Sequence, residues 1–157
     1  EPVELQALTQ QIVDDALLEA GQRGAHVHAS LQAGLTVRGS RELLQRAIEN
    51  VVRNAVRFTD TGTVVEVALE RQPNRAVLTV RDHGPGVPAD ALERIFKPFY
   101  RVAGDRARTT GGTGLGLAIT ERAVSLQGGK VQAQNHPSRG LVVTIELPLE
   151  GGAAAGG

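Results

Sequence analysis

The sequence predicts an α+β fold of two layers, in which a mixed, mostly antiparallel sheet carries about three helices on one face. Three apolar patterns have helical spacing, and segments of alternating polar and apolar residues lie between and after them. Short turn-rich sequences join two pairs of these segments, as in β-hairpins. Helices and hairpins are therefore mixed along the chain, whereas a parallel sheet would need strands and helices to alternate strictly.

The first helix is expected over residues 5–20, where apolar residues recur at intervals of three and four. Gly21 and Gly24 bracket its predicted end, because glycine commonly follows the last turn of a helix. Residues 25–31 and 35–38 are the next candidate strands.

The second helix begins after Ser40, which stands where an N-cap belongs, and its apolar stripe continues to about Val56. Residues 63–69 and 76–82 then form a predicted hairpin. The turn residues 72–74, Gln-Pro-Asn, join its two strands.

Residues 101–112 contain few apolar side chains, and this composition predicts a mobile loop. A third helix is expected from near Gly114 to Gln127, where two glycines stop it. Residues 130–134 and 141–147 form a closing hairpin.

The composition excludes several classes of protein. The 157 residues include 17 basic and 17 acidic side chains, a balance that argues against binding to nucleic acid or an acidic membrane. Because cysteine is absent, disulfides and zinc-thiolate sites are excluded. The longest apolar runs are far shorter than the roughly 20 residues that span a bilayer, so a soluble chain is expected. We predict one domain over residues 1–149 and a disordered Gly/Ala tail over 150–157. The absence of methionine suggests a piece of a longer protein.

The second helix carries a polar group formed by Asn50, Asn54 and Arg57. At about 100° per residue, these three side chains lie within a narrow wedge of the helix. Asparagine carbonyls are hard oxygen ligands suited to Mg²⁺, and an arginine nearby can contact phosphate oxygens. The alternative is an ordinary solvated helix face, which this helix alone favours.

Asp82 ends the apolar face of a predicted strand, and Gly84 and Gly86 follow it. A half-buried carboxylate needs donors, and the exocyclic amine of a purine would supply one. The glycines would allow the backbone to approach the base closely. The alternative is a plain turn in which the aspartate caps its own backbone, and an isolated Asp-x-Gly-x-Gly pattern favours it.

A glycine-rich sequence, residues 111–117, opens the third helix, where backbone amides and the helix dipole favour an anion. It is neither a Rossmann fingerprint, since no strand precedes it, nor a P-loop, since no Gly-Lys-Ser/Thr follows. The preceding loop is locally basic, with Arg101, Arg106 and Arg108 against one acid, Asp105. This charge suits a lid over phosphates. For the glycine-rich sequence the alternative is a flexible linker. For the basic loop it is a merely solvated loop.

Together these segments resemble the four boxes of the sensor histidine kinases. Residues 46–59 resemble the N box, 82–86 the G1 box, 95–101 the F box and 112–117 the G2 box. The boxes stand in family order, and the resemblance covers about residues 3–149. It implies the Bergerat-type ATP-binding fold shared with gyrase, Hsp90 and MutL proteins.

The resemblance also implies a role for each matching residue. Asn54 would be the Mg²⁺ ligand, Asn50 would lie beside the phosphates, and Asp82 would accept from the adenine amine. The implied catalytic residues are Asn50, Arg57 and Arg101. The implied ATP-binding residues are Asn50, Asn54, Arg57, Phe58, Asp82, Gly84, Gly86, Tyr100, Arg101, Gly112, Thr113, Gly114, Leu115, Gly116 and Leu117. ATP and Mg²⁺ are the implied cofactors. The family often has Lys and Tyr where this chain has Arg57 and Phe58.

Related ATPases carry a glutamate four residues before the metal-binding asparagine, and that glutamate activates water. This chain has Asn50 at that position, and Glu49 is turned roughly 140° away from Asn54. An amide cannot take a proton from water, which favours a kinase over a hydrolase. A nucleotide-gated interaction module without catalysis, and a related Bergerat-fold ATPase, remain alternatives.

In sensor kinases an acidic residue directly follows the phosphorylated histidine, and none of His26, His28, His83 and His136 has that neighbour. The resemblance therefore implies an ATP-binding catalytic domain separate from the dimerisation and phosphoacceptor domain of its parent protein. A response regulator would act downstream. The domain is expected in the cytoplasm, with the parent anchored in the inner membrane.

Overall fold

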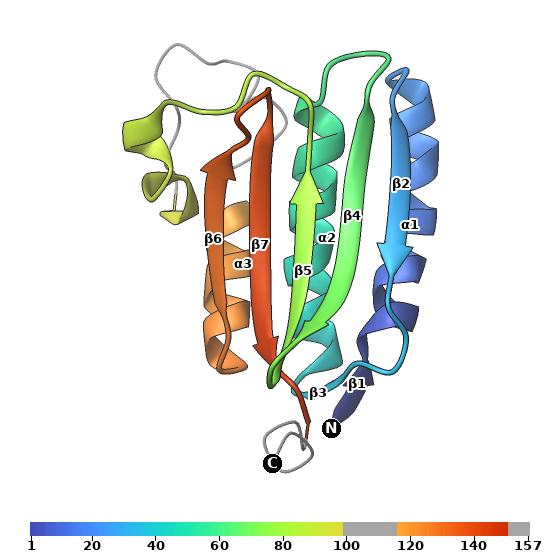
Figure 1. Cartoon of the computed structure of the whole chain (residues 1–157), viewed down its shortest axis with the longest axis vertical. Coiled ribbons are helices and arrows are strands. Elements are labelled where there is room, and N and C mark those ends of the chain that lie inside the picture. The colour runs from blue at the N-terminus through green and yellow to red at the C-terminus, as the bar shows by residue number, and fades with distance from the viewer. Residues whose placement is uncertain (99–115, 151–157) are drawn as a thin grey trace.

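The computed structural model describes residues 1–98 and 116–150, shown in Figure 1. Within these residues the chain forms three α-helices: α1 (Leu5–Gln22), α2 (Arg41–Phe58) and α3 (Gly116–Leu126). The main sheet has the strand order β2 (His26–Leu31), β4 (Val64–Gln72), β5 (Arg75–Arg81), β7 (Leu141–Pro148) and β6 (Lys130–Asn135). Strands β2 and β4 are parallel, and the other neighbours are antiparallel. The predicted fold class is confirmed.

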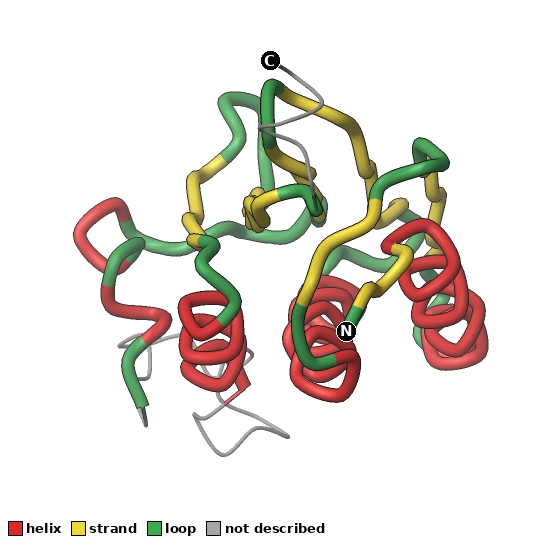
Figure 2. Tube along the Cα trace, turned by 90° about the horizontal axis from the view of Figure 1, so that it is seen from below, coloured by secondary structure: helices red, strands yellow, loops and turns green. Residues whose placement is uncertain are grey.

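The three helices lie side by side on one face of the sheet, as the end-on view in Figure 2 shows. The core fills the space between the two layers, because α2 buries one apolar stripe and the strands bury alternate residues. Leu44, Ile48 and Val51 of α2 and Val65 and Ile145 of the sheet are at most 1% exposed. The opposite face of the sheet carries more polar side chains.

Helix α2 starts and ends as its sequence predicts. The Ser40 hydroxyl accepts a hydrogen bond from the Leu43 amide at 3.2 Å, which confirms the N-cap. At the other end, the Thr59 amide donates to Ala55 O at 2.9 Å. A buried hydrogen bond from the Thr120 hydroxyl to Ala47 O, 3.0 Å long, fastens α3 to α2. The polar face of α2 is therefore held next to the start of α3.

Several element boundaries differ from the predictions. Helix α1 continues to Gln22, so Gly21 lies inside it, and the left-handed residue after its end is Gly24, with φ of 73°. Strand β4 extends to Gln72, and Asn74 adopts the positive φ of the turn.

Three short elements were not predicted. Strand β1 (Pro2–Glu4) pairs antiparallel with β3 (Thr36–Arg38) in a separate two-stranded sheet. Two 3₁₀ helices, η1 (Ala89–Ala91) and η2 (Arg94–Phe96), follow the G1 segment. The predicted loop over residues 101–112 and all but the first residue of the predicted tail lie outside the described residues.

Candidate functional site

The polar group on α2 contacts the start of α3. The side-chain amide of Asn50 donates a hydrogen bond to Gly116 O at 3.2 Å. Asn50, Asn54 and Arg57 are all half-buried. Arg57 forms no ion pair with any residue in the described part of the chain. The predicted N box and the last predicted glycine of the G2 box are thus neighbours in space.

Asp82 is the most deeply buried acidic residue among those described, with 1% of its surface exposed. The sequence predicted only half-burial, and this prediction was wrong. Its Oδ1 atom accepts hydrogen bonds from the backbone amides of Gly84 at 2.9 Å and Leu141 at 3.1 Å. The bond to Gly84 is the local cap that a plain turn would also make. The bond to Leu141 comes from a distant hairpin and fixes the carboxylate at the end of the sheet.

Both glycines after Asp82 allow close packing of backbone. A Cβ atom added to Gly84 would lie 2.0 Å from Phe58 O, so only glycine fits against the end of α2. Gly86 has a φ of 74°, and an added Cβ would lie 2.6 Å from Asn135 Oδ1. Asn135 in turn accepts from the Val87 amide and donates to Val87 O. The G1 segment is therefore held between α2 and the β6–β7 hairpin.

Phe58 ends α2 and is only 6% exposed, so its ring lies almost entirely inside the protein. Its carbonyl contacts the G1 segment, as described above for Gly84. The resemblance to the sensor histidine kinases implies that Phe58 lies by the adenine. The structure brings the residue into the same region as Asp82.

Part of the predicted site lies outside the described residues. This part comprises Tyr100, Arg101, Gly112, Thr113, Gly114 and Leu115. Gly116 and Leu117 are the first two residues of α3, where Gly116 is exposed and Leu117 is half-buried. The described portion of the site therefore consists of the α2 face, the start of α3 and the G1 segment.

Sequence reasoning missed the residues that hold these parts together. The Thr59 hydroxyl accepts a hydrogen bond from the His83 amide at 2.9 Å. The Asn135 side chain accepts one from the Val87 amide. A Cβ atom added to Gly140 would lie 1.9 Å from Asp82 O. The signal for Thr59 was its place directly after the N-box helix. Asn135 ends β6 and Gly140 stands in the turn-rich sequence that follows, and no local pattern distinguishes them.

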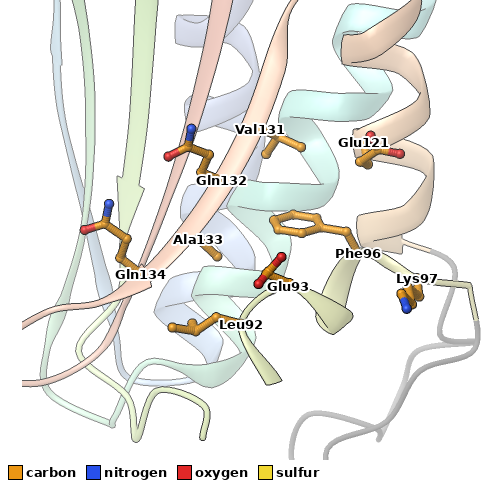
Figure 3. Close-up of a pocket in the computed structure, with 9 residues that line it drawn as sticks. All are labelled: Leu92, Glu93, Phe96, Lys97, Glu121, Val131, Gln132, Ala133 and Gln134. Carbon is orange, nitrogen blue, oxygen red and sulfur yellow. The ribbon is translucent and has the colours of Figure 1, made fainter. Parts of the chain in front are cut away.

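A separate pocket of about 610 Å³ lies between η2, α3 and the edge strand β6 (Figure 3). Phe96 extends from η2 into it, and Glu121, Val131 and Gln134 line other sides. Among the described residues, no side chain predicted to bind ATP lines this pocket. The pocket is therefore distinct from the region around Asp82 and Asn50.

Within residues 1–98 and 116–150 no group of three or more histidines and acids is arranged to hold a metal ion. A Mg²⁺ site in this region would instead rely on amide oxygens such as that of Asn54, together with phosphate oxygens and water. The half-buried position of Asn54 fits that donor set. In the same described ranges, no helix has the length and apolar character needed to cross a membrane.

A model of the protein family described as "Histidine kinase-, DNA gyrase B-, and HSP90-like ATPase" matches residues 39–151. This range contains α2, the G1 segment and α3, which are the elements that build the site. The chain therefore belongs to this family.

Individual relatives show which members of this family the chain is similar to. The chain is 39% identical over 150 residues to the sensor histidine kinase CpxA of Escherichia coli K12, a match that covers 95% of this chain and 32% of CpxA. It is 38% identical over 128 residues to the signal transduction histidine-protein kinase BaeS of the same organism, covering 82% of this chain and 27% of BaeS. The chain thus spans about a third of the length of the curated relatives it matches. Its homologues are sensor histidine kinases.

Solved structures agree with this class. The mycobacterial sensor histidine kinase MprB superimposes with a TM-score of 0.87 at 28% identity, over 96% of this chain and 99% of that chain. Full-length ShkA in complex with AMPPNP superimposes with a TM-score of 0.81 at 29% identity, over 95% of this chain and 31% of ShkA. The fold is that of histidine kinase catalytic domains.

Proposed function

We propose that this domain binds Mg-ATP and transfers the γ-phosphoryl group to a histidine on a dimerisation and phosphoacceptor domain outside this chain. The observation that carries the proposal is the convergence of a buried carboxylate and an amide-bearing helix face. Asp82 lies at the end of the sheet, and the segment after it packs on the last residue of α2. The same helix presents Asn54 about one turn earlier and Asn50 about two turns earlier.

In this proposal the two ends of the site bind the two ends of the nucleotide. The buried Asp82 carboxylate accepts a hydrogen bond from the adenine amine, and Gly84 and Gly86 allow the segment after it to pack closely on Phe58 and Asn135. Phe58 lies beside the base. Asn50 and Arg57 contact the phosphates, and Asn54 supplies an oxygen ligand to Mg²⁺.

The bound Mg²⁺ would neutralise charge on the phosphates, and the remaining work of the site is positioning. Asn50 stands where a water-activating glutamate would be needed for hydrolysis, and an amide cannot act as a general base. Its side chain is also engaged, since it donates to Gly116 O. These features favour transfer to an external nucleophile over hydrolysis.

The similar proteins support this proposal. ShkA was solved with AMPPNP, an ATP analogue, and the curated relatives are sensor histidine kinases. By this proposal the chain acts in the cytoplasm as the catalytic domain of a sensor kinase anchored in the inner membrane. Its partners would be the phosphoacceptor domain of the same parent protein and a response regulator. Arg101 and the G2 residues 112–117 would complete the phosphate end.

A second candidate function is a nucleotide-gated interaction module that binds ATP without catalysis. It uses the same Asp82 and α2 contacts, so binding alone does not separate the two. Acid-labile phosphorylation of a supplied phosphoacceptor domain separates them, because a silent module would leave that domain unlabelled.

The site assignment is tested by calorimetry with ATP and Mg²⁺ on the wild-type chain, Asp82→Asn and Asn54→Ala. Asp82→Asn keeps an oxygen that can accept from Gly84 and Leu141, so the fold is expected to survive. We expect the wild type to bind and both variants to bind more weakly. If neither substitution weakens binding, the site assignment is wrong.

A further inference from the structure

The backbone of the G1 segment is joined to the end of α2 by a closed ring of hydrogen bonds. The His83 amide donates to the Thr59 hydroxyl at 2.9 Å, and the two hydroxyls of Thr59 and Thr63 lie 2.7 Å apart. The Thr63 hydroxyl donates to Asp60 O, and the Asp60 amide closes the ring with a long bond of 3.5 Å to His83 O. Residues from the end of α2 and from the end of β5 therefore form one unit.

The direction of each bond in this ring follows from the number of protons available. A hydroxyl has one proton to donate and can accept on its lone pairs. The proton of Thr63 is used on Asp60 O, so the Thr59 hydroxyl must donate to Thr63. The Thr59 oxygen then accepts from His83. A chain of bonds in one direction is cooperatively strengthened, and it cannot be reversed without losing a bond.

Thr59 occupies the central position in this ring. Its backbone amide ends α2 by donating to Ala55 O, and its hydroxyl holds the amide of the residue after Asp82. The helix that ends at this point carries Asn50 and Asn54. The hydroxyl of Thr59 therefore links the proposed phosphate end of the site to the proposed base end.

We propose that Thr59 is a positioning residue that sets the spacing between Asp82 and the amide side chains of α2, and thereby the affinity for the adenine end of the nucleotide. The inference rests on the proposed function, because it takes Asp82 as the base contact. Thr59 acts through Asp82 and need not touch the nucleotide. Without its hydroxyl, the His83 amide loses its acceptor, and the backbone directly after Asp82 loses a hydrogen bond to the end of α2.

The test compares Mg-ATP binding by calorimetry in Thr59→Val, Thr59→Ser and the wild-type chain. Thr59→Val keeps the shape and removes the hydroxyl, and we expect binding about five- to tenfold weaker, the loss typical of one hydrogen bond. Thr59→Ser restores the hydroxyl and should bind within about twofold of wild type. The matched control is Thr9→Val, because the Thr9 hydroxyl is buried without a hydrogen-bond partner. That control should bind ATP as the wild type does.

A double-mutant cycle with Asp82→Asn shows whether Thr59 acts through Asp82. In the Asp82→Asn background, Thr59→Val should cause little further loss. Tripolyphosphate, which has no base, should bind equally well to the wild type and Thr59→Val. If Thr59→Val does not fold, Thr63→Val replaces it, since it removes the acceptor of the Thr59 proton and should weaken ATP binding in the same direction.

Three results would overturn the inference: unchanged ATP binding in the folded valine variant, no rescue by serine, or fully additive losses in the cycle. The cycle also separates this inference from the proposed function. If Asp82→Asn weakens ATP binding but the loss of the Thr59 hydroxyl does not, only the role of Thr59 fails. If Asp82→Asn alone leaves ATP binding unchanged, the base site itself fails, and the role of Thr59 fails with it.

Discussion

The side-chain amide of Asn50 on α2 donates to the backbone oxygen of Gly116, the first residue of α3, although 66 positions separate them in the chain. This bond joins two segments that the sequence marked independently, one as an amide-bearing helix face and the other as the end of a glycine-rich run. It places the start of α3 over the polar face of α2.

Replacement of Asp82 by Asn should change the choice of base. The carboxylate accepts from the adenine amine, whereas inosine triphosphate presents a keto oxygen at that position. We expect the wild type to prefer ATP over inosine triphosphate by about tenfold or more, as for a hydrogen bond to a charged group. Asp82→Asn should reduce or reverse this preference, because an amide can donate to the keto oxygen. Competitive binding of the two nucleotides measures it, and an unchanged ratio would exclude Asp82 from the base contact.

Replacement of Asn54 by Ala should remove much of the effect of Mg²⁺ on ATP binding. An amide oxygen is one of few protein ligands available here, because no group of three or more acids and histidines in the described ranges is arranged to hold a metal ion. We expect the apparent Mg²⁺ affinity of the ATP complex to fall by at least about tenfold. Titration of Mg²⁺ at fixed ATP, with a chelator as the reference, measures it. A variant that responds to Mg²⁺ like the wild type would rule out Asn54 as a ligand.

Gly84→Ala should destabilise the domain, because the added Cβ would lie 2.0 Å from Phe58 O. The expected loss is about 1–3 kcal/mol or more, since both groups belong to constrained backbone. Gly21→Ala is the matched control: it lies inside α1, and an added Cβ there meets no atom within 4 Å. It should stabilise by about 0.5–1 kcal/mol. Denaturant unfolding of both variants checks the pair, and equal stabilities would show that the G1 segment does not pack tightly on α2.

Thr120→Val should weaken the attachment of α3 to α2 by removing the buried bond to Ala47 O. The expected cost is about 1 kcal/mol in the free energy of unfolding. Thr9→Val removes a buried hydroxyl that makes no hydrogen bond, so it should be neutral or stabilising. Urea denaturation compares the two. Equal effects of both substitutions would contradict a specific role for the Thr120 bond.

The sequence predicted the fold well where local signals were strong. The three helices and both hairpins follow from apolar periodicity and turn residues, and Ser40 caps α2 as expected. The pairing of β1 with β3 was missed because both strands are only three residues long, and their partnership depends on distant contacts. The predicted end of α1 was too early, because Gly21 adopts the helical conformation and the helix continues through it. The bonds that close the last turn run from the Arg23 amide to the carbonyls of Glu19 and Ala20.

The sequence predicted individual residues of the site but not the hydrogen bonds between them. Asp82, Asn50 and Gly84 were marked by residue type and spacing. The burial of Asp82 was underestimated because Leu141, which donates to it, comes from another hairpin. The role of Thr59 depends on a bond to His83 across 24 positions, and its place after the N-box helix does not reveal that partner. Contacts between distant segments are the part that periodicity cannot supply.

The most direct test of the central claim is a phosphotransfer assay with γ-labelled ATP, Mg²⁺ and the phosphoacceptor domain of the parent protein. The claim predicts an acid-labile, alkali-stable label on a histidine of that domain, strongly reduced with Asp82→Asn and Asn54→Ala and retained with Thr9→Val. Little free phosphate should form when the acceptor is omitted. Rapid hydrolysis of ATP by the chain alone, with an unlabelled acceptor, would contradict the claim that this domain is a histidine kinase catalytic domain.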